Sequence, residues 1–240
     1  MPSRHRKLAL ESLVPYESRM SLAVVTGANR GIGLALVQQL VGRGQPVVAA
    51  CRKSSPALVK ARVEVIEGVD VAQAEGVEPL VRALGSRPVS LLINNAGILI
   101  EEEGLGQLEF GQILRQFEVN AMGPLRVTQA LLHLLERGAK VGLVTSRMGS
   151  IDDNSSGGYY GYRMSKAALN MAGKSLSRDL ETAQVAVAIL HPGMVKTDMV
   201  GGAGQVEPEQ AARGLLARLD ELTLETSGGF WHANGERLPW

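Results

Sequence analysis

The sequence predicts an α/β fold with a single doubly wound parallel sheet of about seven strands and helices on both faces. Two observations lead to this prediction. Short apolar, β-branched runs alternate along the chain with longer segments of helical spacing, which is the pattern of a parallel sheet with crossover helices. The first run ends in a glycine-rich turn that opens a helix. With 240 residues, 45% hydrophobic and 20% charged, the chain is long enough to bury one full core.

Composition excludes several classes of protein. A net charge of +1 leaves no basic footprint for nucleic acid, and no apolar run approaches the roughly 20 residues that span a bilayer. Cys51 is the single cysteine, so no internal disulfide can form and a reducing compartment is indicated. We therefore expect a soluble, cytoplasmic protein with no nucleic-acid or membrane partner. Residues 1–20 are expected to form a poorly ordered extension before a domain of residues 21–240.

The first predicted strand, residues 22–25, leads into a candidate nucleotide site. Gly27, Gly31 and Gly33 follow it in the pattern G-x-x-x-G-x-G, and helical spacing of apolar residues begins at Ile32. This pattern differs from the usual dinucleotide fingerprint, G-x-G-x-x-G. Glycines let the backbone approach a pyrophosphate at a helix N-terminus, where free N–H groups and the helix dipole favour negative charge. A purely structural glycine turn is the alternative.

The end of the second predicted strand, residues 47–51, bears on the choice of cofactor. Enzymes of this architecture that use NAD usually place an acidic residue there to bind the ribose 2′-OH. No Asp or Glu occurs between residues 18 and 63, whereas Arg30 lies in the glycine turn and Arg52-Lys53 follow the strand. A guanidinium suits the dianionic 2′-phosphate. The sequence therefore favours NADP(H), although Arg52 and Lys53 also fit the start of a solvated loop.

The later elements continue the alternation. Apolar runs predict further strands at residues 63–66, 91–93, 141–145, 185–190 and 227–230. Helical spacing predicts helices at residues 72–84, from about 108 onward, and at about 161–180 and 207–222. Asn120 and Gly123-Pro124 interrupt the second of these helices, which predicts a kink there.

Tyr162, Lys166 and Ser146 are the candidate chemical groups. On a helix, Tyr162 and Lys166 lie one turn apart and on the same side. A phenol has a pKa of about 10, and a neighbouring ammonium is expected to lower that pKa toward the range useful for general acid–base catalysis. Ser146 follows the predicted strand 141–145, at the edge where such sheets bind ligands. Taken alone, the Tyr–Lys pair also fits a solvated helix surface.

Five motifs occur in one order along the chain, namely Thr26–Gly33, Asn94–Gly97, Ser146, Tyr162–Lys166 and Pro192-Gly193. Together they resemble the classical short-chain dehydrogenase/reductase family, whose members have a Rossmann-type fold. The resemblance covers nearly everything after Met20. The stretch from Gly228 to Trp240 particularly resembles the branch that contains the sniffer-like carbonyl reductases and the bacterial C-factor proteins.

The resemblance implies an NADP(H)-dependent oxidoreductase that reduces a small-molecule carbonyl to an alcohol. Its catalytic set would be Ser146, Tyr162, Lys166 and Asn120, with Asn120 holding a water that links the lysine to solvent. The residues that the resemblance places at the cofactor are Gly27, Asn29, Arg30, Gly31, Ile32, Gly33, Arg52, Asp70, Val71, Asn94, Ala96, Gly97, Tyr162, Lys166, Pro192, Gly193, Val195 and Thr197. Family members often pair through the helix that matches residues 161–180, so a homodimer is also an expectation.

Other interpretations stay open at this point. A nucleotide-binding regulatory or signalling protein of the C-factor type would need the glycine turn but no proton donor. An epimerase or dehydratase on the same fold generally has more chain for its substrate than the roughly forty residues after Val200. His191 lies near the predicted site, but no other His or Cys has metal-ligand spacing beside it, so a structural role and no metal are expected. Asp70 also fits an N-cap of the following helix.

Overall fold

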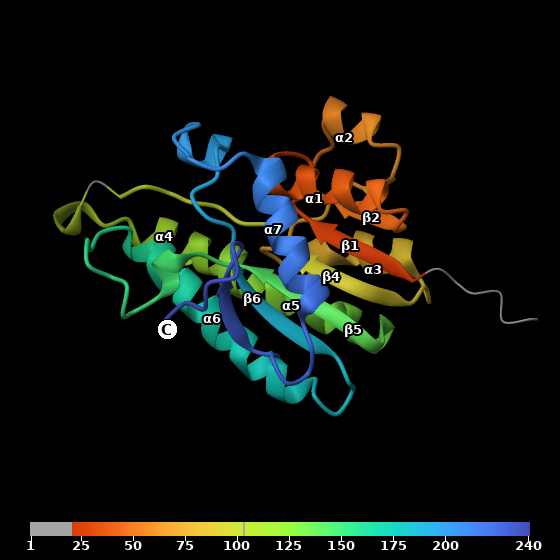
Figure 1. The fold of residues 1–240 in the computed structure, drawn as a ribbon. Coiled ribbons are helices and arrows are strands. Elements are labelled where there is room, and N and C mark those ends of the chain that lie inside the picture. Colours follow the sequence, from red (N-terminus) through yellow and green to blue (C-terminus); the bar gives the residue numbers. More distant parts are fainter. Residues whose placement is uncertain (1–20, 103) are drawn as a thin grey trace, which may run out of the picture.

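The computed structural model describes residues 21–102 and 104–240 (Figure 1). The predicted extension, residues 1–20, lies outside the described residues. Seven strands form one sheet in the order β3-β2-β1-β4-β5-β6-β7, and every neighbouring pair is parallel. The strands are β1 (Leu22–Thr26), β2 (Val47–Ala50), β3 (Glu64–Ile66), β4 (Val89–Asn94), β5 (Leu135–Val144), β6 (Ala186–His191) and β7 (Gly229–His232). The predicted doubly wound parallel sheet is confirmed.

Helices cover both faces of the sheet. They are α1 (Gly31–Gly42), α2 (Pro56–Lys60), α3 (Glu78–Leu84), α4 (Phe110–Phe117), α5 (Gly123–Leu131), α6 (Tyr160–Asp179) and α7 (Pro208–Glu221). Buried side chains of α1, α2 and α7 pack on one face, and those of α3, α5 and α6 pack on the other. Figure 1 shows α1 and α7 on the opposite side of the sheet from α6.

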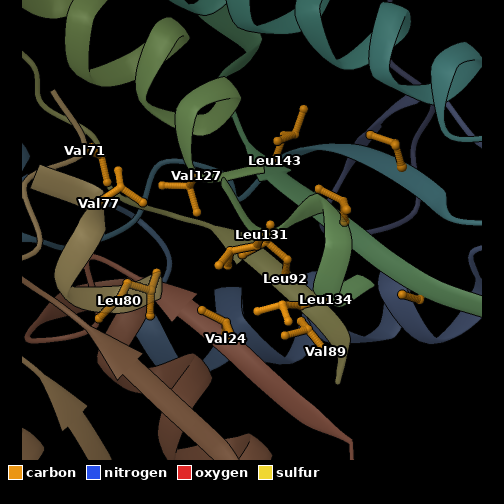
Figure 2. Packing of buried hydrophobic residues seen from close by; sticks show 14 of the residues in the cluster. Val24, Val71, Val77, Leu80, Val89, Leu92, Val127, Leu131, Leu134 and Leu143 are labelled. Carbon is orange, nitrogen blue, oxygen red and sulfur yellow. The ribbon is translucent and has the colours of Figure 1, made fainter. Parts of the chain in front are cut away.

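Alternate residues of each strand enter two different cores. Val24 belongs to the core beneath α3, α5 and α6, whereas the next residue, Val25, belongs to the core beneath α1 and α7. Figure 2 shows the first of these cores, in which Val24 and Leu92 of the sheet cluster with Leu80 and Leu131 of the helices. These four side chains are fully buried, and each contributes roughly 1.5–3 kcal/mol through burial. Burial on both faces explains why the strands read as continuous apolar runs.

Two predicted helices have a different form in the structure. The helix predicted over residues 72–84 is a 3₁₀ turn, Glu75–Val77, followed by the shorter α3. The long helix predicted from residue 108 is divided into α4 and α5 by a π-helical segment, Glu118–Met122. Pro124 lies in the first turn of α5, where its missing N–H is tolerated. The predicted interruption of the helix around Asn120 is thus found, and it takes the form of a π-helical turn.

The winding of the chain reverses at the centre of the sheet. β1 has β2 on one side and β4 on the other, so the chain passes from one half of the sheet to the other between β3 and β4. Ligands of open parallel sheets bind outside the carboxyl ends of the strands at such a switch point. The predicted site residues lie at or after the carboxyl ends of β1 to β6, or on the helical segments that follow β4 and β5.

Candidate active site

A large crevice lies at the carboxyl ends of the central strands. Its volume is about 1810 Å³, and its wall runs from the glycine turn after β1 to the segment of residues 194–203 after β6. Nearly all of the predicted site residues line it. The exceptions are Asn94 and Asn120, whose side chains are buried behind the wall.

Two glycines of the turn occupy positions that have no room for a side chain. Gly27 has a φ of +63°, and a Cβ atom there would lie 2.8 Å from the Cα of Ala96. A Cβ on Gly33 would collide with the carbonyl oxygen of Gly27. Glycine is therefore required by backbone packing within the turn as well as by left-handed backbone geometry.

Asn95 joins the glycine turn to the end of β4. Its side-chain amide donates hydrogen bonds to the carbonyl oxygens of Thr26 at 3.0 Å and Gly27 at 3.2 Å. In return, the Thr26 hydroxyl accepts from the backbone N–H groups of Asn95 and Ala96 at 3.0 and 3.1 Å. Asn94 points the other way and donates to the Thr128 hydroxyl of α5 at 3.2 Å. Of the two adjacent asparagines, Asn95 lines the crevice, although Asn94 was the one predicted to contact the cofactor.

The N-terminus of α1 fits an anionic group. Arg30 is the N-cap residue and makes no side-chain capping bond, and the first turn holds no acidic residue, so the first N–H groups and the helix dipole can accept negative charge. Ser55 donates a hydrogen bond to the carbonyl oxygen of Asn29 at 2.6 Å, which ties the segment of Arg52 to the glycine turn. The Arg30 guanidinium contacts Asp198 across the crevice at 3.0 Å. The close backbone of the glycine turn, the N–H groups at the start of α1 and the arginines at positions 30 and 52 together fit a phosphorylated dinucleotide.

Asp70 and Val71 lie at the end of the crevice near β3. The carboxylate of Asp70 accepts a hydrogen bond from the N–H of Ala72 at 3.0 Å. The following 3₁₀ turn and α3 have Ala74 and Val77 as their N-cap residues, so Asp70 is not the helix N-cap that the sequence allowed. Its other oxygen is 3.6 Å from the guanidinium of Arg115 on α4. Both Asp70 and Val71 still line the crevice.

Ser146, Tyr162 and Lys166 lie together on the wall beyond β5. Ser146 follows β5, and its hydroxyl accepts from the N–H of Met148 at 3.1 Å. Tyr162 and Lys166 lie one turn apart on α6, and the Lys166 Nζ is 5.7 Å from the centre of the Tyr162 ring. The Lys166 ammonium donates to the carbonyl oxygen of Val144 at 3.0 Å. All three side chains are at least nine-tenths buried, which contradicts the alternative of a solvated helix surface.

Burial shifts the pKa values of the tyrosine and the lysine in opposite directions. Loss of water raises the pKa of Tyr162 to about 12, and a hydrogen bond with Ser146 offsets part of that rise. Loss of water lowers the pKa of Lys166 to about 8. The expectation that the ammonium lowers the tyrosine pKa below its ordinary value is wrong, because desolvation of the phenolate dominates. At neutral pH the phenol therefore keeps its proton.

Asn120 is fully buried on the π-helical segment and acts through its contacts with the protein. Its side-chain oxygen accepts from the N–H of Ile98 at 2.8 Å, and its amide donates to the carbonyl oxygen of Ile98 at 2.8 Å and to the Ser165 hydroxyl at 3.0 Å. Both N–H groups of the side-chain amide are thus paired within the protein. Its backbone lies in a π-helical turn, where the normal α-helical pairing is interrupted.

His191 ends β6 and lines the crevice. Its ring meets that of His232 edge-on, with centroids 4.9 Å apart. Burial and the nearby cationic groups lower the pKa of His191 to about 3, so the ring is neutral. Within residues 21–102 and 104–240, no cluster of His, Cys, Asp and Glu could hold a metal ion, and no helix is both long and apolar enough to span a membrane.

The fold and the family of the chain agree with each other. The all-parallel sheet and its crevice place the chain among the doubly wound, Rossmann-type α/β proteins. Residues 21–207 match the family described as short chain dehydrogenase. The chain therefore belongs to the short-chain dehydrogenase/reductase family of oxidoreductases.

Two relatives refine this placement. The chain is 46% identical over 227 residues to 1-hydroxy-2-glutathionyl-2-methyl-3-butene dehydrogenase of Rhodococcus sp., a match that covers 92% of this chain and 100% of the relative. It is 47% identical over 155 residues to the C-signal protein of Myxococcus xanthus, which covers 64% of this chain and 93% of the relative.

Two solved structures are similar over almost their whole length. One is the carbonyl reductase Sniffer of D. melanogaster, with a TM-score of 0.84 and 31% identity over 92% of this chain and 99% of that one. The other is the NADPH-bound carbonyl reductase from chicken fatty liver, with a TM-score of 0.82 and 29% identity over the same shares. The predicted branch, which contains sniffer-like carbonyl reductases and C-factor-like proteins, is confirmed.

Proposed function

We propose that this chain is an NADP(H)-dependent oxidoreductase that reduces an aldehyde or ketone to an alcohol. The observation that carries this proposal is the buried group of Ser146, Tyr162 and Lys166 on the wall of the crevice that begins at the glycine turn. A protein that only bound a nucleotide would need the glycine turn, but it would have no use for a buried phenol that opens onto the same space.

The chain's own residues would bind and protonate the substrate. The nicotinamide, when bound, supplies the hydride that the carbonyl carbon receives. Tyr162 then gives its phenolic proton to the carbonyl oxygen, and the two transfers together complete the alcohol. The Ser146 hydroxyl donates a hydrogen bond to the same oxygen and stabilises the charge that develops there.

Lys166 has two roles in this proposal. Its ammonium stabilises the phenolate that remains after the proton has left Tyr162, because the two groups lie close together in a desolvated wall. We also assign it a hydrogen bond to the ribose beside the nicotinamide. Asn120 contributes by holding Ile98 and Ser165, and thereby the segment after β4, in place.

The cofactor would extend along the crevice, held by residues from each strand end. Gly27 to Gly33 and the N-terminus of α1 would bind the pyrophosphate, Asp70 and Val71 the adenine, and Ala96 and Gly97 the ribose. The residues from Pro192 to Thr197 would hold the nicotinamide. Arg30 and Arg52 would bind the 2′-phosphate, and the NADPH-bound carbonyl reductase neighbour supports this preference.

A test of the proposal is oxidation of NADPH across a panel of aldehydes, ketones and quinones. A second assay should follow reduction of NADP⁺ during oxidation of a glutathionyl alcohol, because the Rhodococcus relative is named as a dehydrogenase of such a compound. We expect Tyr162→Phe to reduce turnover by about 100-fold or more while NADPH binding stays within about twofold, since the ring still fills its place. Near-normal turnover in this variant would remove Tyr162 from the role of acid.

The C-signal relative supports a second candidate, a signalling protein whose nucleotide-bound state is recognised by a partner. That protein would bind NADPH tightly and show no turnover with any member of the panel. The intact set of Ser146, Tyr162 and Lys166 favours the enzyme.

We further propose a homodimer through α4 and α6. Their outer surface carries exposed apolar side chains, including Phe110 at 74% and Met171 at 69% exposure, with Leu114 and Met164 nearby on the same helices. Large exposed apolar patches on a protein surface mark sites of protein–protein contact. Sedimentation equilibrium of the full chain tests this proposal, and a monomer at micromolar concentration would contradict it.

A further inference from the structure

The segment from Ile98 to Glu102 is held by side chains on α4 and the π-helical turn. Asn120 pairs with both backbone groups of Ile98. One turn earlier, Gln116 repeats this arrangement with Ile100, whose N–H donates to the Gln116 side chain at 3.0 Å and whose carbonyl oxygen accepts at 3.3 Å. Gln116 and Asn120 are fully buried. Gln116 and Asn120 are four residues apart, and the backbone groups that they pair with, on Ile100 and Ile98, are two residues apart. The two side chains thus form the hydrogen bonds that the backbone of a neighbouring strand would form.

At its far end, this segment delivers a carboxylate to the start of α6. The Glu102 Oε1 accepts a hydrogen bond from the N–H of Gly161 at 2.7 Å. The other oxygen, Oε2, is also buried and has no hydrogen-bond partner within the described part of the chain. The N-cap of α6, Tyr159, makes no side-chain capping bond and has a left-handed φ of 51°. Glu102 therefore supplies from a distance the cap that α6 lacks.

The contact with α6 is close because position 161 is glycine. A Cβ atom there would lie 2.5 Å from the Gln116 Nε2, 2.9 Å from the Glu102 Oε1 and 3.1 Å from the Cα of Ile113. Gln116 and Glu102 thus rest directly on the backbone of the residue before Tyr162. A displacement of either side chain would move the first turn of α6.

We propose that Glu102 and Gln116 are positioning residues that set the place of the Tyr162 phenol in the crevice. This inference rests on the proposed function, in which Tyr162 is the proton donor. Gly97 immediately precedes this segment, and a Cβ atom there would be 3.6 Å from the Lys166 Nζ. One segment, held by the side chains of Gln116 and Asn120, therefore connects the crevice wall beside Lys166 to the helix turn that carries Tyr162.

Four variants separate the parts of this connection. Glu102→Gln keeps an oxygen that can accept from Gly161 but removes the charge, and Glu102→Ala removes both. Gln116→Leu keeps the volume but leaves both backbone groups of Ile100 without partners. Glu109→Ala is the control, because Glu109 is an exposed acid near the start of α4 whose side chain has no polar partner within the described residues.

We expect Glu102→Ala and Gln116→Leu to lower kcat by about tenfold, since small displacements of a reacting group have effects of this order. The Kd for NADPH should stay within about twofold. Glu102→Gln should recover most of kcat, because its side-chain oxygen can still accept the hydrogen bond from Gly161.

Hydrogen exchange at the Gly161 amide gives a measurement that does not depend on turnover. Glu102→Ala should raise that exchange rate by tenfold or more, whereas Glu102→Gln and Glu109→Ala should leave it near that of wild type. Unchanged exchange in Glu102→Ala, or faster exchange with unaltered kcat, would overturn the inference. A wild-type chain without turnover on any carbonyl would instead contradict the proposed function, whatever the exchange at Gly161 shows.

Discussion

Replacement of Lys166 by methionine should abolish turnover and yet stabilise the folded chain at neutral pH. Lys166 is 4% exposed, and burial lowers its pKa from 10.5 to about 8. At pH 7 the side chain is charged in both the folded and the unfolded chain. The folded state therefore bears the free-energy cost of keeping an ammonium away from water.

The size of the effect follows from the shift in pKa. A difference of about 2.5 between the unfolded and folded values corresponds to about 3 kcal/mol at pH 7. Between pH 8 and 10.5 the unfolded chain holds more protons than the folded chain, so the stability of the wild type rises with pH in this window. By pH 9.5 the remaining cost is about 1 kcal/mol.

The methionine variant also loses the hydrogen bond to the carbonyl oxygen of Val144. That loss costs about 1–2 kcal/mol and is the same at both pH values. We therefore expect Lys166→Met to be about 1–2 kcal/mol more stable than wild type at pH 7, with that advantage about 2 kcal/mol smaller at pH 9.5.

Urea unfolding of both chains at pH 7 and 9.5 measures this difference. Lys174→Met, on the same helix but only partly buried, is the matched control and should show no such change with pH. If the stability of Lys166→Met relative to wild type does not depend on pH, desolvation of the lysine is not the cause of its shifted pKa.

Two further predictions concern the cofactor. Arg52→Ala should weaken NADPH binding by about tenfold or more and leave NADH almost unaffected, because only NADPH offers a 2′-phosphate for a charge-assisted bond; equal losses in a fluorescence titration would contradict the NADP(H) preference. Asp198→Asn should strengthen NADPH binding by about twofold to fivefold at low salt, since it frees Arg30 from an exposed ion pair of modest strength. A weaker affinity for NADPH in this variant would show that Asp198 does not compete for Arg30.

Local patterns in the sequence were enough to predict the sheet and the glycine turn. β1 is apolar from Leu22 to Val25. Gly27 and Gly33 occupy positions where a side chain would strike the backbone, so the local sequence already indicates the local geometry. The spacing of Tyr162 and Lys166 defines a helix face without reference to the rest of the chain. The short helix α2 was not predicted, since Pro56–Lys60 is too brief for a clear periodicity.

Long-range contacts set the parts of the site that were not predicted. Asn94 and Asn95 are chemically identical, and only the pleat of β4 decides which of them faces the crevice. Gln116 reads as an ordinary polar residue until the fold brings Ile100 beside it. The direction of the Tyr162 pKa shift was predicted wrongly because spacing reveals the neighbouring charge but not the depth of burial.

The opposite shifts of Tyr162 and Lys166 bear on the direction of the proposed reaction. At neutral pH the phenol, with a pKa of about 12, keeps its proton, and the amine, with a pKa of about 8, keeps its charge. Proton donation then creates a phenolate near an ammonium, and the attraction between the two charges opposes the cost that burial adds to phenolate formation. In the proposed function, carbonyl reduction therefore starts from the protonation state that Tyr162 has at neutral pH, whereas alcohol oxidation starts from the phenolate, which becomes more abundant as the pH rises.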